Sequence, residues 1–220
     1  MFLITGYIPA ENAEALKTEL TTTQEAYVEL CDPSDEDDVP VKLKNNKFAA
    51  PVEGVLESYS MPGKHEIDPS GIMAVFYYFL FGMMLSDAGY GLVMVLGCGI
   101  ILHKFKNMEE GLRKTLTMFL YCGISTIFWG ILFGSFFGFE NVIPALWLHP
   151  KEAMTTLPFI GSMNTVFVAA VAFGMFMILT GMVLHMINAA RNHKLGELPF
   201  SQNSLAGFIF YGALAVTLVL

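Results

Sequence analysis

Long apolar blocks dominate the chain from about residue 71 onward, whereas shorter apolar runs alternate with polar residues before it. A helix that spans a bilayer needs about 20 largely apolar residues to cross a hydrocarbon core of about 30 Å. Residues 115–137 and 164–190 meet that requirement, and residues 205–220 meet it only if the helix continues. The pattern therefore predicts a polytopic α-helical membrane protein.

The apolar block at residues 71–102 is too long for one untilted crossing and short for two. Lys and Arg tend to stay on the cytoplasmic side of a membrane. A single crossing would place the basic residues that follow this block on the outside. We therefore predict a short helical hairpin with spans at 71–86 and 88–103, which breaks at Ser86-Asp-Ala-Gly-Tyr-Gly91.

Basic residues also predict the orientation of the whole membrane domain, residues 71–220. They precede the first span, follow the second and follow the fourth: Lys42, Lys44, Lys47, Lys64, Lys104, Lys106, Arg113, Lys114, Arg191 and Lys194. By the positive-inside rule these clusters are cytoplasmic. The N-terminal part is then cytoplasmic as well, and the loop at 139–163 lies on the other side.

The first 38 residues carry the pattern of a small βαβ unit. Residues 2–8 and 26–30 predict strands, and residues 11–21 predict a helix between them. Two strands and one helix bury too little surface for a stable core. We therefore expect residues 1–38 to be the end of a cytoplasmic α/β domain with an acidic linker, and the chain to be a fragment.

Residues 39–70 form a proline-containing connector between this segment and the first span. Within it, residues 52–59 predict a short helix with clustered apolar side chains. Such a helix lies either against its own domain or on the membrane surface, and the sequence favours neither.

Composition and charge agree with a membrane protein that has a polar N-terminal part. Of 220 residues, 54% are hydrophobic and 15% charged, and the net charge is −8. The acidic run at 32–38 is typical of a solvated linker. Cys31, Cys98 and Cys122 show no metal-type or paired spacing, so we interpret them as small buried residues.

Several function classes lack their sequence signals. The chain contains no nucleotide-binding loop, zinc motif, nucleophile elbow or basic aromatic patch. Of its aspartates only Asp87 lies in a predicted span, which disfavours an intramembrane aspartyl protease. We expect no catalytic site, cofactor, metal or nucleic-acid partner.

Asp87 is the most informative residue, because it is a carboxylate within a largely apolar tract. A charge at the bilayer centre costs roughly 2.5 to 3.5 kcal/mol, so such a group is usually shielded, hydrated or used for transport. Ser86 or Asp87 could accept hydrogen bonds from the free N–H groups of the next helix, while Gly89 and Gly91 permit a tight backbone or close helix approach. This capping role is favoured over a proton relay.

Two further features lie in later spans. Gly130, Gly134 and Gly138 recur at intervals of four, which would line small residues along one helix face and allow close packing. His185 lies near the cytoplasmic end of the fourth span. It could relay protons, but a hydrogen-bonded packing role is favoured.

Three segments together resemble a known family. They are Pro40-Val-Lys-Leu-Lys-Asn45, Glu66-Ile-Asp-Pro69 and Phe81-Gly-Met-Met-Leu-Ser-Asp-Ala-Gly-Tyr-Gly-Leu92, and the opening Thr5-Gly-Tyr-Ile-Pro9 is similar to a turn of the same family. The family is the membrane stator subunit, called subunit a or subunit I, of V-type and archaeal-type rotary ATPases. Met, Ser and Tyr around Asp87 resemble its bacterial branch, which implies the cell membrane of a prokaryote.

The resemblance implies a role in coupling ATP hydrolysis or synthesis to H⁺ or Na⁺ movement. In that family a cytoplasmic arm braces the peripheral stalks, and a helical bundle lies beside a rotating proteolipid ring. An arginine on a late membrane helix faces the ring carboxylates, whose ionised form an adjacent cation favours. Arg113 and Arg191 lie at helix ends and do not match it. The resemblance therefore implies an essential arginine beyond Leu220 and a mainly scaffolding role for this chain, among lipid and the other ATPase subunits.

Two other classes remain as alternatives to a rotary ATPase subunit. A stand-alone secondary transporter would also combine a broken helix with a membrane acid, although the sequence shows one break rather than a pair. A membrane anchor for a cytoplasmic sensor domain would have no coupling to ion flow. Both H⁺ and Na⁺, and both ATP synthesis and hydrolysis, are compatible with the sequence.

Overall fold

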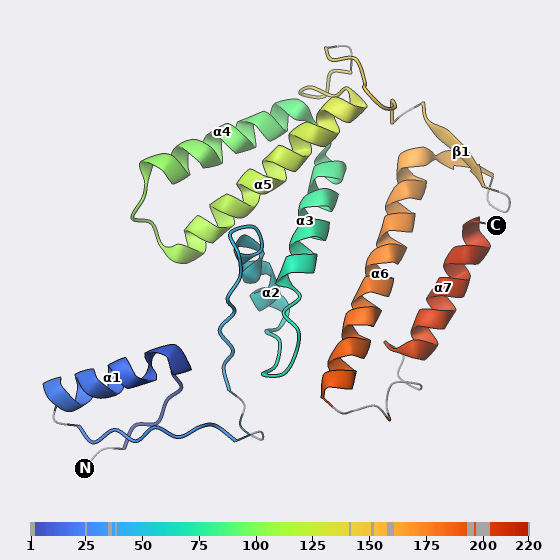
Figure 1. Cartoon of the computed structure of the whole chain (residues 1–220). Helices are drawn as coiled ribbons and strands as arrows, with labels where there is room; N and C mark the ends of the chain where they lie inside the picture. Colours follow the sequence, from blue (N-terminus) through green and yellow to red (C-terminus); the bar gives the residue numbers. More distant parts are fainter. Residues whose placement is uncertain are drawn as a thin grey trace.

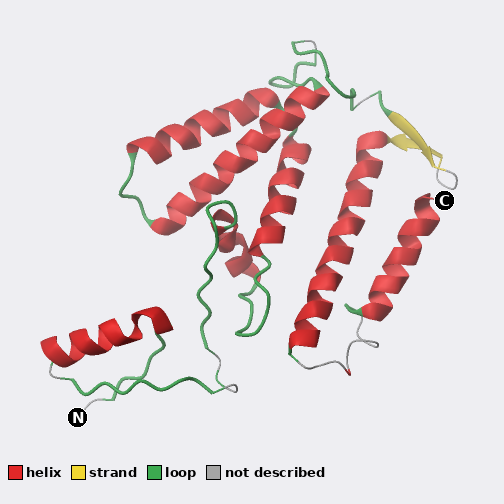
Figure 2. Cartoon of the chain, viewed as in Figure 1, coloured by secondary structure: helices red, strands yellow, loops and turns green. Residues whose placement is uncertain are grey.

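The computed structural model describes residues 3–24, 26–34, 37, 39–140, 142–150, 152–157, 161–192, 196 and 203–219. Within these residues the chain is mostly helical, and its strands form one small hairpin (Figure 2). The elements in chain order are α1 Ala10–Thr23, the 3₁₀ turn η1 Ala50–Val52, α2 Glu53–Tyr59, α3 Ser70–Leu85, α4 Ala88–Lys104, α5 Glu110–Phe133, β1 Met154–Leu157, β2 Gly161–Asn164, α6 Thr165–Arg191 and α7 Leu205–Val219.

The N-terminal segment corrects the predicted βαβ unit. Helix α1 covers the predicted helix, but residues 3–9 and 26–34 form no strand. A strand needs a ladder of hydrogen bonds to a neighbour, and α1 buries none of its residues and so provides no core on which two strands could pair. Figure 1 shows α1 lying apart from the other helices.

Helices α3, α4 and α5 form the best-packed part of the molecule. Helices α4 and α5 run side by side in opposite directions, and α3 packs against α5 (Figure 1). Their core near α2 contains Val52, Ala74, Tyr78, Met118 and Cys122. The buried Tyr78 hydroxyl donates to the carbonyl of Phe48 at 3.0 Å.

The connector helix packs against this core. Val52 and Leu56 are buried, and η1 contacts both α3 and α5. Of the two alternatives left by the sequence, residues 50–59 therefore adopt the one in which the helix packs on its own chain.

Helix α6 lies beside α3 and is preceded by the β1–β2 hairpin. Strand β1 pairs antiparallel with β2, and Thr155 lies opposite Met163. Asn164 caps α6 by accepting a hydrogen bond from the N–H of Val166 at 2.9 Å. The ring of Phe173 on α6 stacks on Phe79 of α3, with 4.5 Å between centroids.

Among the residues that the structure describes, two helices, α5 and α6, are long and apolar enough to cross a membrane. Helices α3, α4 and the first part of α7 are apolar but shorter. Helices α3, α4, α6 and α7 begin and end within a few residues of the predicted spans. Helix α5 starts and ends earlier than its predicted span of 115–137. That each of the five crosses a bilayer stays a prediction.

Candidate functional site

Asp87 lies at the break between α3 and α4, where the chain reverses direction (Figure 1). Ser86 ends α3 in a left-handed backbone conformation with φ of 34°, which turns the chain out of the helix. Asp87 then begins α4. Its Oδ1 accepts from the N–H groups of Gly89 at 2.9 Å and Tyr90 at 3.1 Å. These are free donors at a helix start, and a carboxylate there also meets the positive end of the helix dipole.

The same carboxylate binds the turn that follows α5. Oδ1 accepts from the N–H of Phe137 at 2.9 Å, and Oδ2 accepts from the N–H of Gly138 at 2.7 Å. The Ser135 hydroxyl also donates to Oδ2 at 2.9 Å. We call Asp87 with Ser135, Phe137 and Gly138 the Asp87 cluster. The sequence pattern assigned Gly138 to a helix face and indicated none of the three as a partner of Asp87, because they lie in an irregular turn.

These contacts determine what Asp87 can do chemically. Its residue surface is only 5% exposed. A carboxylate offers about four lone-pair positions, and the five donors of the cluster and the helix start occupy them. This geometry suits an anchor that joins two chain reversals.

Close backbone approach brings α5 to the hairpin break. A Cβ at Gly130 would lie 2.6 Å from the carbonyl carbon of Asp87 and would also collide with the N of Ala88. A Cβ at Gly91 would lie 2.7 Å from the N of Ile127, also on α5. Also on α4, a Cβ at Gly89 would meet the Phe137 ring at 2.6 Å. The structure therefore requires glycine at positions 91 and 130, where a Cβ would meet backbone, while at position 89 the Phe137 ring would have to shift.

The predicted face of three glycines on one helix needs correction. Helix α5 ends at Phe133, so only Gly130 of the three lies within it. Gly134 is the C-cap, with φ of 72°, and Gly138 lies in the following turn, with φ of 79°. Glycine recurs at intervals of four beyond the end of α5 because left-handed positions in a turn also favour glycine.

A second polar cluster lies where α2, α3 and α5 meet. The Asn45 amide donates to Glu53 Oε1 at 2.8 Å and to Asp68 Oδ2 at 2.7 Å. Lys114 of α5 donates to Glu53 Oε2 at 2.9 Å. We call these four residues the Glu53 network. Asn45 ends one of the motif segments noted in the sequence and Asp68 lies within another, which was the available signal, whereas nothing indicated that Lys114 reaches them.

His185 does not contact the Asp87 cluster. Its Nδ1 lies 3.2 Å from the hydroxyl of Ser204, a fully buried residue just before α7. This pair joins the ends of α6 and α7.

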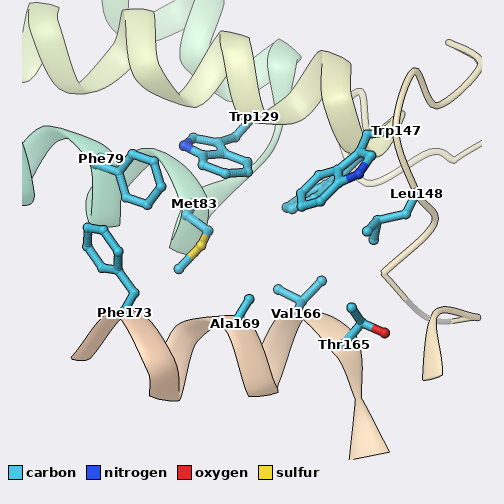
Figure 3. Close-up of a pocket in the computed structure, with 10 residues that line it drawn as sticks. Phe79, Met83, Trp129, Trp147, Leu148, Thr165, Val166, Ala169 and Phe173 are labelled. Carbon is cyan, nitrogen blue, oxygen red and sulfur yellow. The ribbon is translucent and has the colours of Figure 1, made fainter. Parts of the chain in front are cut away.

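An apolar cavity of about 200 Å³ lies between α3, α5 and α6. Figure 3 shows Phe79 and Met83 of α3, Trp129 of α5 and Phe173 of α6 turned toward it. Thr165 at its edge shares a hydrogen bond with Thr155 at 2.8 Å. Such a lining suits apolar groups rather than hydrated ions.

A sequence model of the V-type ATPase 116 kDa subunit family matches residues 1–155. The chain belongs to this family. The match includes the Asp87 cluster and the Glu53 network, so both are features of a V-type ATPase 116 kDa subunit family member.

Named relatives agree with this family membership. The chain is 32% identical over 190 residues to the A-type ATP synthase subunit I of Pyrococcus abyssi, covering 84% of this chain and 28% of the relative. It is 32% identical over 207 residues to that of Pyrococcus horikoshii, covering 92% and 31%. It is 34% identical over 139 residues to the V-type ATP synthase subunit I of Borreliella burgdorferi, covering 61% and 22%. The chain thus spans less than a third of each relative's length.

Proposed function

We propose that this chain forms part of the membrane stator subunit of a rotary ATPase, which couples ATP hydrolysis or synthesis to the movement of H⁺ or Na⁺. The observation that carries the proposal is the family match over residues 1–155. The relatives named as ATP synthase subunit I support it.

The role proposed for this chain is mainly scaffolding. Asp87 has all its acceptor positions occupied by groups of the same chain. An ion carrier must release and rebind its ion, which would require breaking this cluster in every cycle. The His185–Ser204 contact likewise supports a packing role for His185.

The proposed setting is a multi-pass subunit in the cell membrane of a prokaryote, with the N-terminal part in the cytoplasm. Relatives in archaea and bacteria support the prokaryotic membrane. Lys104, Lys114 and Arg191 lie at the helix ends opposite the Asp87 break, in keeping with a cytoplasmic face there. Large apolar residues exposed on α4 and α6, such as Ile100 and Phe176, would face lipid or further membrane helices.

The proposed partners are the proteolipid rotor ring, the peripheral stalk subunits and the remaining ATPase subunits. A copurification experiment tests this assignment. Affinity capture of the tagged subunit from gently solubilised membranes should recover a proteolipid and soluble ATPase subunits in fixed ratio. Capture of a folded, monodisperse protein without them would favour a stand-alone transporter and contradict the proposal.

A further inference from the structure

An open hollow of about 730 Å³ lies along α4 and the turn after it. It is lined by Val95, Leu96, Gly99, Ile100, His103, Lys104 and Lys106. Neither the Asp87 cluster nor the Glu53 network contributes to it.

The hollow has an apolar half and a basic half. Leu96 and Ile100 lie on successive turns of α4 and are 54% and 63% exposed. Gly99 between them has no side chain, and a Cβ there would meet only Leu120, at 4.0 Å. The basic residues follow at the C-terminal end of the helix. An apolar strip thus leads directly to a positively charged rim.

The charges of this rim are not neutralised by the protein. In the part of the chain that the structure describes, neither Lys104 nor Lys106 forms an ion pair, and the Lys104 ammonium lies 5.9 Å above the Phe105 ring. By contrast, Lys114 on the next helix pairs with Glu53 and Glu110. The C-terminus of α4 contributes a partial negative charge of about one half, which the two full lysine charges exceed.

We propose that the α4 hollow binds an anionic phospholipid, with the headgroup phosphate between Lys104 and Lys106 and an acyl chain along Leu96 and Ile100. The inference rests on the proposed membrane location of α4. Charge complementarity selects the occupant: a soluble anion would leave the apolar strip empty, and a zwitterionic lipid would bring a second cation toward two lysines. Basic pockets at the cytoplasmic ends of membrane helices bind anionic headgroups in this way.

Native mass spectrometry of the full chain, released from nanodiscs of phosphatidylglycerol or phosphatidylcholine, tests the proposal. The wild type should retain phosphatidylglycerol in preference to phosphatidylcholine. K104Q/K106Q should bind phosphatidylglycerol about thirtyfold more weakly, since each lysine near an anionic surface contributes about 1 kcal/mol. Gly99→Leu, which fills the hollow and leaves the charge unchanged, should also lower retention.

The matched control is R113Q/R191Q, which removes the same charge at the same end of the helices but outside the hollow. It should retain the lipid within about twofold of the wild type. Equal losses in both double variants, or full retention by Gly99→Leu, would overturn the proposal in favour of diffuse attraction. Copurification with ATPase subunits is measured separately, so a chain that assembles but shows no lipid preference refutes this site and leaves the proposed function standing.

Discussion

The backbone N–H of Gly138 donates a hydrogen bond of 2.7 Å to Asp87 Oδ2, although the two residues are separated by 51 positions in the sequence. This contact joins the reversal between α3 and α4 to the reversal after α5. Non-helical backbone at membrane depth is tolerated only where protein or water satisfies its polar groups. The Asp87 cluster supplies partners to both reversals at once, which gives the carboxylate a structural reason to lie in an apolar tract.

Gly130→Ala should destabilise the α3–α4–α5 unit. The added Cβ would lie 2.6 Å from the Asp87 carbonyl carbon, where only rigid backbone could move. We expect a loss of about 1–3 kcal/mol, the usual cost of overpacking. Thermal unfolding of the purified chain in detergent measures it. The control is Gly97→Ala on α4, where a Cβ meets nothing within 4 Å. It should be neutral or stabilising by up to about 1 kcal/mol, and equal losses in both variants would contradict the close approach.

Lys114 and Glu53 should be energetically coupled. The Lys114 and Glu53 side chains are 35% and 14% exposed, and Lys114 Nζ lies 2.9 Å from Glu53 Oε2. The Asn45 amide also donates a hydrogen bond to Glu53 Oε1. A double-mutant cycle with Lys114→Met and Glu53→Gln should give a coupling of about 1–2 kcal/mol. The matched control is the Lys44–Glu11 pair, whose side chains are 87% and 79% exposed. That pair should show no measurable coupling, because water screens it. Equal coupling in the two cycles would refute the importance of the Glu53 network.

Cysteine labelling should report the proposed orientation. Cys31 is exposed in the N-terminal segment, which also corrects the expectation that all three cysteines are buried. A membrane-impermeant maleimide applied to intact cells should leave Cys31 unlabelled until the membrane is permeabilised. Leu146, which is 72% exposed in the loop after α5, lies on the side of the membrane proposed to face away from the cytoplasm. In Cys31→Ser/Leu146→Cys the new thiol should react in intact cells or spheroplasts, and the reverse pattern would invert the topology.

Local signals predicted the hairpin break well. The signals were the length of the apolar block, the positions of the lysines and the Ser86-Asp87 sequence, all of which can be read from residues close together in the chain. The structure shows Asp87 accepting hydrogen bonds from the first N–H groups of α4. The contacts with Ser135, Phe137 and Gly138 depend instead on how an irregular turn folds back across the bundle. No periodicity records that geometry, so the cap was predictable and the second half of the cluster was not.

The prediction of two strands in the N-terminal segment was wrong, because strand formation depends on a pairing partner as well as on local residue types. Residues 3–8 and 26–30 contain residue types that favour strands, yet a strand forms only with a partner that pairs along its edge. Helix α1 buries no residue, so these segments find no such partner in the described residues. Local residue types thus predict the propensity to form a strand, while pairing decides whether the strand forms.

We propose that Asp87 anchors the bundle and does not carry the ion. Asp87→Asn keeps one acceptor oxygen but turns an N–H group toward the N–H of Gly138 or of Phe137, so part of the cluster must break at a cost of about 1–3 kcal/mol. Ser135→Ala removes one donor and leaves the carboxylate charge, so it should weaken the Asp87 cluster less than Asp87→Asn does.

The most direct measurement compares assembly with transport in the complex that contains the full-length subunit. The amount of assembled complex and the rate of ATP-driven ion pumping per assembled complex are determined for the wild type, Asp87→Asn and Ser135→Ala. We predict that assembly falls in both variants, further in Asp87→Asn, while pumping per assembled complex stays near the wild-type rate. Normal assembly of Asp87→Asn with pumping abolished would contradict the account.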